Sequence, residues 1–282
     1  MIPSFLFRAV VLVYAPALLV AQSREDVARE RADYVGWLQT APNSPFAAKA
    51  QQPVGAGVRL GPPDADIPLE GIAEHRLTAR GPALILQTRS DTQLVSPGRA
   101  IKVGPYSLYL SRSARGPVVT VFGQVSDKQP PGHYEYDPSV VFTGQLLPPE
   151  KRQRVRVLGP DGVEVEAAAA GSIVVPLGAP TRLRVLRMPA ASGEESELEI
   201  FFRDESNGRG SYPAGRFVSL VPTANGKYRL DLNRARNPFC AYNSVYPCPA
   251  PWRGNTLPVP VHAGERYGGP AASAVPPQQE AS

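Results

Sequence analysis

The sequence predicts a mostly β protein: two consecutive β-sandwich or open-barrel modules, preceded by a signal peptide and one short amphipathic helix. Proline accounts for 32 of the 282 residues. A helix interior tolerates few prolines, because each one removes a backbone donor and clashes with the preceding turn. Short β-branched and aromatic stretches alternate with turn residues about every ten positions, which is typical of sandwiches and barrels. A helical bundle or a coiled coil is therefore excluded.

Residues 1–21 have the pattern of a signal peptide. Arg8 precedes a run of apolar residues from Ala9 to Ala21, which contains Pro16. A helix that spans a bilayer needs about 20 residues, so this shorter run is more typical of a cleaved signal that ends at Ala21. An uncleaved N-terminal anchor is the alternative. Both interpretations place the rest of the chain in a secreted or periplasmic compartment, and no transmembrane span is expected after signal cleavage.

Residues 22–50 are predicted to form a helix and a linker. Ser23 and Asp26 have the spacing of a capping box. Apolar residues then return at helical spacing from Val27 to Leu38, and two prolines follow at positions 42 and 45. We expect this helix to pack on the first β module.

The first β module is predicted over residues 51–128. Its clearest strands are Leu84–Leu86, Tyr106–Leu110 and Val118–Phe122, each short, apolar and bounded by turn residues. Residues 129–133 are proline-rich and predict a linker to the second module.

The second β module is predicted over residues 134–268. Its clearest hairpin pairs Arg154–Leu158 with Val163–Glu166 through the turn residues 159–162. The further strands expected in this module are Thr181–Leu186, Leu198–Phe202, Arg216–Leu220 and Lys227–Leu232. Residues 269–282, rich in alanine, proline and glutamine, are predicted to be a disordered tail.

The two cysteines of the chain, Cys240 and Cys248, lie eight positions apart. In an exported chain such a pair favours a disulfide over a metal site. Closing the loop would stabilise the fold by roughly 2.5 kcal/mol in the chain-entropy model. A zinc site would need further ligands, and the cysteines with His262 do not follow a finger or ribbon spacing. We therefore predict a disulfide and no metal.

The positive charge of the chain does not predict a nucleic-acid partner. The formal net charge is +5, from 30 basic and 25 acidic residues. In the densest basic stretch, residues 151–156, basic residues alternate with other residues, as they do along a strand with one face in solvent. Nucleic-acid binding would favour a clustered basic stripe with interleaved aromatic residues. The partners of the protein remain unknown at this point.

The second module carries an ordered series of unusual residues. They are Phe202-Arg-Asp204, Ser206-Asn-Gly208, Tyr212, Gly215-Arg-Phe217, Leu230-Asp-Leu-Asn233, Ala235, Asn237-Pro-Phe-Cys240, Tyr246-Pro-Cys-Pro249 and Ala263-Gly-Glu265. The stretch from about Glu135 to Arg266 resembles the bacterial family catalogued as domain of unknown function 1684. Ser206 stands where that family usually has threonine, and Leu232 where it usually has phenylalanine. The resemblance implies a fold but no established activity.

The first module has a weaker resemblance. Val58–Gly61, Asp64–Leu69 and Glu74-His75 are similar to the forkhead-associated sandwich, which in many proteins recognises phosphothreonine. That recognition uses an arginine directly after the glycine, where this chain has Pro62, and a serine near the histidine, which is missing here. Without the guanidinium there is no bidentate partner for a phosphate. The resemblance therefore implies the fold, and phosphopeptide binding is not expected.

The polar residues of the second module are the candidates for function. The sequence lacks the Gly-x-Ser-x-Gly elbow, the His-Glu-x-x-His helix and the phosphate and dinucleotide loops, so no catalytic residue and no cofactor is predicted. The candidate ligand-binding residues are Asp204, Tyr212, Arg216, Asp231, Asn233 and Asn237, and Arg234 and Glu265 belong to the same polar block. They could hold an anionic or sugar ligand, or they could be ion pairs and turns that fix the loop at Asn237.

Three functions follow from these observations. The favoured one is an exported binding or scaffolding module with any ligand site in the C-terminal domain. The second is a hydrolase of an anionic or sugar-like substrate, with Asp204 or Asp231 as general base and Arg216 as substrate ligand. The third is a purely structural envelope protein. The sequence does not decide whether the protein is an enzyme, and we favour the binding role.

Overall fold

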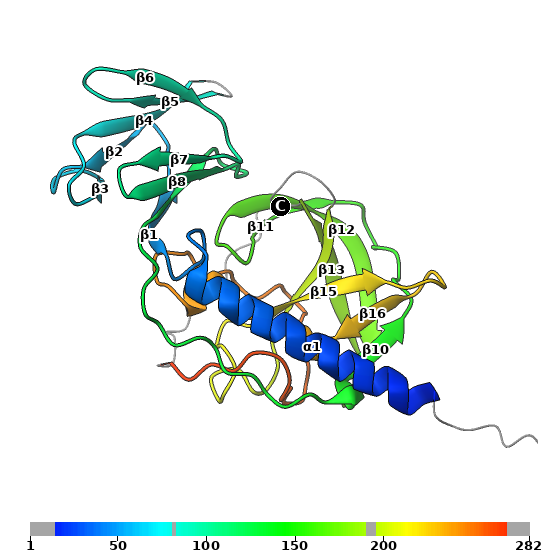
Figure 1. Ribbon diagram of the computed structural model, residues 1–282. Coiled ribbons are helices and arrows are strands. Elements are labelled where there is room, and N and C mark those ends of the chain that lie inside the picture. The colour runs from blue at the N-terminus through cyan, green and yellow to red at the C-terminus, as the bar shows by residue number, and fades with distance from the viewer. Residues whose placement is uncertain (1–14, 81–82, 190–195, 270–282) are drawn as a thin grey trace, which may run out of the picture.

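The computed structural model describes residues 15–80, 83–189 and 196–269 (Figure 1). This part of the chain is mostly β, as predicted, with one α-helix followed by three sheets. Two of the sheets form the first module, and the third forms the C-terminal domain. Residues 1–14 and the predicted tail from residue 270 lie outside the described residues.

The helix α1 (Ala15–Thr40) is longer than predicted. It begins within the expected signal peptide, so Ser23 lies inside the helix rather than at its N-cap. Val27 and Leu38 are buried, and Arg31 and Tyr34 lie between them on the same face at helical spacing. Over the residues that the structure describes, no helix has the length and apolar character needed to cross a membrane.

The helix lies along the C-terminal domain, which corrects our expectation that it packs on the first module (Figure 1). Arg31 donates to the carbonyl oxygens of Tyr134 at 2.9 Å and Asn233 at 3.0 Å. Glu30 forms an ion pair with Arg234 at 2.7 Å. The expectation relied on closeness along the chain, whereas these polar groups on α1 find their partners more than 100 residues away.

The first module is a sandwich of two sheets around one apolar core. The first sheet has the strand order β1 (Ala48–Pro53), β9 (Val118–Phe122), β8 (Tyr106–Ser111), β7 (Ala100–Val103). The second has the order β3 (Ile67–Pro68), β2 (Val58–Gly61), β4 (His75–Arg80), β5 (Ala83–Gln87), β6 (Thr92–Val95). Leu60, Leu77, Leu108 and Val119 from the two sheets meet in the core and are fully buried.

The C-terminal domain is built on one antiparallel sheet that curls on itself (Figure 1). Its strand order is β10 (Val141–Gly144), β16 (Tyr228–Asp231), β15 (Arg216–Pro222), β14 (Glu197–Phe202), β13 (Thr181–Met188), β12 (Glu164–Val175), β11 (Arg154–Leu158). The segment after β10 bonds to the middle of β12, where Leu147 and Ser172 exchange backbone hydrogen bonds at 2.8 and 2.9 Å. This module is therefore an open barrel.

Gly171 makes that closure possible. Its φ of 145° lies in a region that L side chains rarely adopt, and a Cβ there would overlap the carbonyl oxygen of Leu147. The register of β12 against β13 also shifts between Ala169 and Gly171. This bulge reverses the alternation of side chains along β12. Side chains at equivalent positions before and after it therefore point to opposite faces of the sheet.

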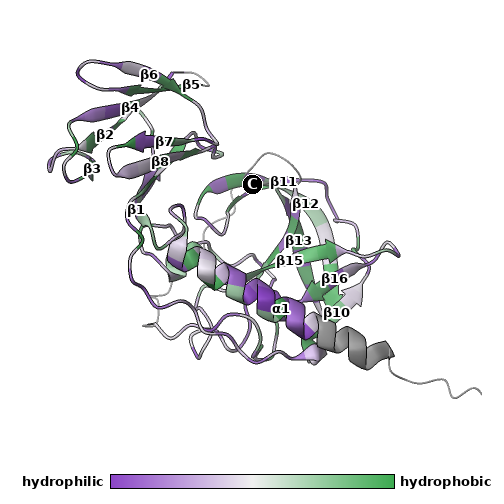
Figure 2. Ribbon diagram, in the orientation of Figure 1, coloured by the Kyte–Doolittle hydropathy of each residue, from purple (hydrophilic) through white to green (hydrophobic). Residues whose placement is uncertain are grey.

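The sheet of the C-terminal domain is covered on both faces. One face covers the main apolar core of the domain, which includes Leu183, Val185, Ile200 and Phe202. On the other face Phe201 stacks on Phe217 at 4.2 Å between ring centroids, and irregular segments after β16 cover them. Figure 2 shows the hydrophobic residues along these strands and the hydrophilic ones over much of α1.

The loop between the two cysteines joins the two modules. Cys240 and Cys248 form the predicted disulfide, with 5.5 Å between their Cα atoms. Asn243, in the middle of the loop, donates to the carbonyl oxygens of Pro45 at 2.9 Å and Ala48 at 2.8 Å. The loop therefore holds the start of β1 against the C-terminal domain.

Candidate functional site

Arg216 and Asp204 form a closed, fully buried ion pair. The Nη2 of Arg216 lies 2.8 Å from Oδ2 of Asp204, and neither side chain is exposed. The same Nη2 donates to the carbonyl oxygen of Val261 at 2.9 Å, and Nη1 donates to that of Ala263. The Oδ1 of Asp204 accepts the backbone N–H groups of Ser206 at 2.8 Å and Val261 at 3.0 Å. These bonds pin three segments together. The Nε of Arg216 has no partner among the described residues, but the guanidinium is fully buried and offers a ligand no exposed side.

Asp231 and Asn233 form a second network that fixes a turn. Asp231 lies 2.8 Å from Arg229 and also pairs with Arg234. Its other oxygen accepts the backbone N–H of Asn233 at 3.1 Å and the side-chain amide at 3.0 Å. The amide of Asn233 also exchanges two hydrogen bonds with the backbone of Asp137, at 2.7 and 2.8 Å. The polar groups of Asp231 and Asn233 are thus taken up by the fold.

Tyr212 supports the disulfide. The residue is buried, and its hydroxyl oxygen lies 3.2 Å from the Sγ atoms of both Cys240 and Cys248. Its ring packs edge-on against Tyr267 at 4.8 Å. Burial raises the pKa of Tyr212 to about 12, so the phenol stays neutral. Its position gives it a packing role.

Asn237, by contrast, lines a cavity of about 590 Å³. We call it the junction cavity, because it lies between the linker at 128–132, the loop at 237–242 and the segment 266–269. Its lining residues are Phe46, Lys128, Gln129, Pro130, Pro131, Gly132, Asn237, Ala241, Tyr242, Arg266, Tyr267, Gly268 and Gly269. This volume lies in the range of about 300–1,000 Å³ that is usual for small-molecule sites.

The side chain of Asn237 is left with an unused acceptor. The residue is 2% exposed, and its Nδ2 donates to the carbonyl oxygen of Arg266 at 3.2 Å. Its Oδ1 is buried and has no hydrogen-bond partner in the described part of the chain. Buried side-chain acceptors are in large majority hydrogen-bonded, so this atom marks a place where a partner fits.

Glu265 lies directly behind this wall of the cavity. Its Oε2 accepts the backbone N–H of Asn237 at 2.7 Å and the hydroxyl of Tyr242, while Oε1 is buried without a partner among the described residues. Burial raises the pKa of Glu265 to about 7, against the opposing hydrogen bonds of Tyr242 and Asn237. Glu265 thus holds two residues of the cavity in place, and its carboxyl group is itself fully buried.

The charged side chains around the junction cavity are all basic. Lys128 and Arg266 line it, and no aspartate or glutamate does so among the residues described. The Nζ of Lys128 donates to the carbonyl oxygen of Tyr242 at 3.1 Å, and the guanidinium of Arg266 lies 5.4 Å above the ring of Tyr134. Burial, with help from the nearby charge of Lys49, lowers the pKa of Lys128. The cavity therefore presents positive charge without a carboxylate to balance it.

One of the residues predicted from the sequence lines this cavity. Asn237 was among the predicted ligand residues, and Glu265 belonged to the same polar block. Lys128, Phe46 and Arg266 were missed, because they come from three segments far apart in the chain and carry no motif. In the described ranges no group of three histidine, cysteine, aspartate or glutamate residues is placed to hold a metal ion.

A second hollow, of about 650 Å³, lies in the first module. Residues 61–63 and 68–73 line it, among them Pro62, which occupies the position expected for a phosphate-binding arginine. None of its lining side chains is both polar and buried in the part of the chain that is described. This hollow offers a ligand few specific contacts.

The comparison with family models agrees with the sequence resemblance in the C-terminal domain. Residues 132–266 match the family described as "Protein of unknown function (DUF1684)". A solution NMR structure of an uncharacterized protein from Haloarcula marismortui is 27% identical, covers 50% of this chain and 77% of its own, and gives a TM-score of 0.41. No curated protein matches the chain. The part of the chain that holds Asn237, Tyr242 and Glu265 thus lies within the match to the DUF1684 family of proteins of unknown function.

Proposed function

We propose that the protein is an exported binding module whose ligand site is the junction cavity. The observation that carries this proposal is a cavity of ligand size lined by Asn237, a residue whose buried Oδ1 has no partner in the described chain. A free hydrogen-bonding group that is withdrawn from water costs free energy, and a ligand donor would recover it. The cations Lys128 and Arg266 add a second reason for a ligand.

The two other functions have less support. A hydrolase that uses Asp204 or Asp231 as general base needs a carboxylate that reaches the substrate, yet both are buried and bonded within the fold. A purely structural protein does not need a cavity of ligand size that is lined by two cations, Lys128 and Arg266. The binding role accounts for both the closed networks and the open site.

Two variants test the proposed site. A thermal-shift screen of neutral sugars, sugar acids and organic acids should give ligands that stabilise the protein. Asn237→Ala should abolish these shifts while it leaves the backbone N–H that bonds to Glu265 in place. Asn255→Ala is the matched control, because Asn255 is equally buried and its amide is bonded to Arg184 and Phe201. We expect the control to lower stability and to keep ligand binding.

The proposed site is wrong under either of two results. The first is a screen in which no compound shifts the unfolding temperature. The second is a set of ligands whose shifts survive Asn237→Ala.

The export part of the proposal has its own test. An intrachain disulfide is typical of proteins that leave the reducing cytosol. We expect the intact mass of the protein recovered from its native compartment to lack residues 1–21. A full-length mass would instead indicate an N-terminal anchor.

A further inference from the structure

We infer that the ligand of the junction cavity is a small organic anion that also carries hydroxyl groups, with a sugar acid as the simplest example. This inference rests on the proposed function and adds the chemical class of the ligand. It follows from the charges, the open hydrogen-bonding groups and the apolar walls of one cavity.

The charges favour an anion. Lys128 and Arg266 line the cavity, and neither forms an ion pair within the described residues. The contrast with Arg216 and Arg234 is clear, since each of those meets a carboxylate. An ammonium group has three donors, and one donor of Lys128 is used by the carbonyl of Tyr242. An anionic group in the cavity would take up the others and balance the charge.

The unpartnered acceptor favours a donor on the same ligand. Oδ1 of Asn237 can only accept, because the amide nitrogen of that side chain is already oriented toward the carbonyl of Arg266. A sulfate ion or a simple carboxylate brings acceptors alone and would leave Oδ1 unpaired. A hydroxyl group satisfies it. The ligand therefore combines a negative group with at least one hydroxyl.

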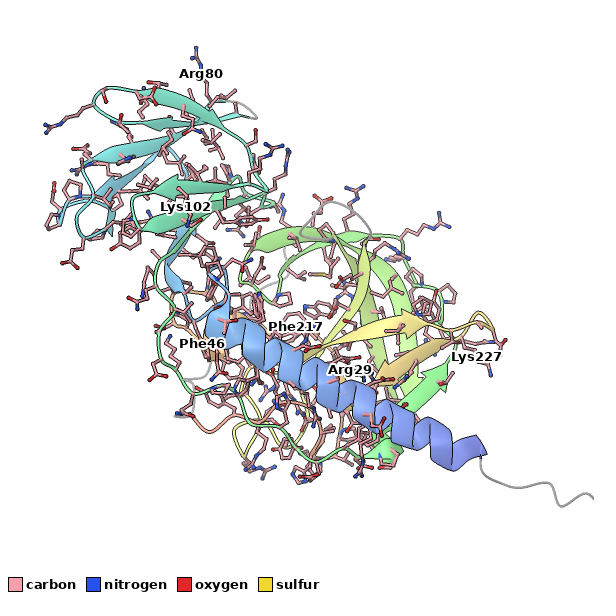
Figure 3. The ribbon with its side chains drawn as sticks, in the orientation of Figure 1. Arg29, Phe46, Arg80, Lys102, Phe217 and Lys227 are labelled. Atoms are coloured by element: carbon pink, nitrogen blue, oxygen red, sulfur yellow. A yellow bond between two sulfur atoms is a disulfide. The ribbon has the colours of Figure 1, made fainter. Side chains whose placement is uncertain are left out.

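The walls favour a compact ring over an extended chain. Phe46 and Tyr242 meet edge to face at 6.3 Å, and Pro130 and Pro131 are part of the same lining. Such apolar surfaces suit the carbon faces of a ring, while the few polar groups set its orientation. Figure 3 shows Phe46 near the C-terminal end of α1, on the side of the linker.

The experiment compares defined probes by calorimetric titration at low ionic strength. Glucuronate supplies both the carboxylate and the hydroxyls, glucose supplies hydroxyls alone, and acetate supplies a carboxylate alone. Glucose 6-phosphate tests whether a phosphate serves as the anionic group. We expect glucuronate or glucose 6-phosphate to bind at least ten-fold more tightly than glucose and acetate. Binding should weaken as salt is added, because salt screens the attraction of exposed and half-buried charges.

Three variants assign the contacts. Lys128→Gln and Arg266→Gln should each weaken binding of the anionic sugar about ten-fold, and Asn237→Ala should do the same by removing the acceptor. The control is Lys227→Gln, because Lys227 is an exposed lysine of the same domain at the turn between β15 and β16, away from the cavity (Figure 3). This control should bind like the wild type. It also separates the local effect of Lys128 from the effect of one lost charge.

The outcomes separate the two proposals. If glucose binds as tightly as glucuronate and Lys128→Gln changes nothing, the inferred ligand class is wrong and the binding site stands. If no probe binds while the broad screen gives neutral ligands that depend on Asn237, the same conclusion holds. If neither the probes nor the screen give a ligand, both the ligand class and the proposed function are wrong.

Discussion

The two modules bury different kinds of residue. In the described residues between 48 and 122, Thr120 is the one buried polar side chain, and leucine and valine fill the core. The C-terminal domain buries charged and amide side chains in several places, including Glu199, Arg216 and Glu265. An apolar core is stable with any good packing, whereas each buried polar group needs its own partner. Buried side-chain atoms without a partner among the described residues include Oε1 of Gln51 in the first module and Oδ1 of Asn237 in the second.

The same comparison can be made inside the C-terminal domain. The guanidinium of Arg216 meets a carboxylate and three backbone carbonyls. Its Nε is buried without a partner among the described residues, but Arg216 does not line the junction cavity. Asn237 keeps one atom open beside a cavity. Both residues belong to the same polar block of the sequence, and only the structure separates the one that holds the fold from the one that can hold a ligand.

The largest effect is expected for the closed network. Arg216→Ala leaves Asp204 buried without its cation, which should cost roughly 3–5 kcal/mol of unfolding free energy. Urea unfolding measures the change. Arg80→Ala is the control in the first module, because Arg80 is exposed and its loss should stay within about 0.5 kcal/mol. A loss below about 1 kcal/mol at Arg216 would mean that the ion pair does not hold the domain together.

The second effect is a dependence of stability on pH. Burial raises the pKa of Glu199 to about 7, so the folded state keeps its proton where the unfolded chain, with a pKa of 4.5, has released it. The contribution of Glu199 to the free energy of unfolding is greatest below the unfolded pKa of 4.5 and decreases as the pH rises through 7. The total decrease is roughly 3 kcal/mol at most. Unfolding at pH 5 and pH 8 should show this decrease.

The variant Glu199→Gln isolates that group. Glutamine can still accept the hydrogen bond that the Oγ of Ser219 donates at 2.6 Å, and it does not titrate. The variant should therefore lose less stability than the wild type between pH 5 and pH 8. Equal losses in the two proteins would assign the pH dependence to other groups, and Glu265 would be tested next.

The third effect concerns the disulfide of the C-terminal domain, which closes the loop that contacts the first module. Replacing both Cys240 and Cys248 with serine should cost roughly 2.5 kcal/mol, because the unfolded chain regains the freedom of the open loop. Reduced wild-type protein should show a similar loss. Alkylation of the native protein without reductant should add no mass, and two added groups would show free thiols.

The smallest effect is expected at the contact between the modules. Asn243→Ala removes two hydrogen bonds to the carbonyls of Pro45 and Ala48, which should cost about 1–2 kcal/mol. Ser244→Ala is the matched control, since the neighbouring Ser244 is exposed. If both variants unfold like the wild type, the loop does not stabilise the position of the first module.

The strands could be predicted where their residues alternate or are β-branched. Val118–Phe122 and Arg154–Leu158 were predicted with the bounds that the structure shows. The strand β12 was predicted to end at Glu166 but runs to Val175, because the four alanines at 167–170 and Gly171 have little strand propensity of their own. Their pairing with β11 and β13 holds them in the sheet.

The site could be predicted less well than the strands. Buried polar residues such as Asp204 and Asn237 look alike in a sequence, since what distinguishes them is whether a distant group completes their hydrogen bonds. The position of α1 could not be predicted from the sequence either. Arg31 bonds to backbone carbonyls that come into reach only when the C-terminal domain is folded. Local patterns predict local structure, and contacts between distant segments decide the rest.

The hydrogen bonds of Asn243 bear on how an exported chain would assemble. They join residues 198 and 195 positions apart. A chain that crosses a membrane with its N-terminus first delivers the whole first sandwich well before Asn243 arrives on the far side. That sandwich can fold early, but it cannot take its final place until nearly the whole chain has been translocated. Because Cys240 and Cys248 flank Asn243, the oxidation of the loop and the joining of the two modules would fall in the same last stage of maturation.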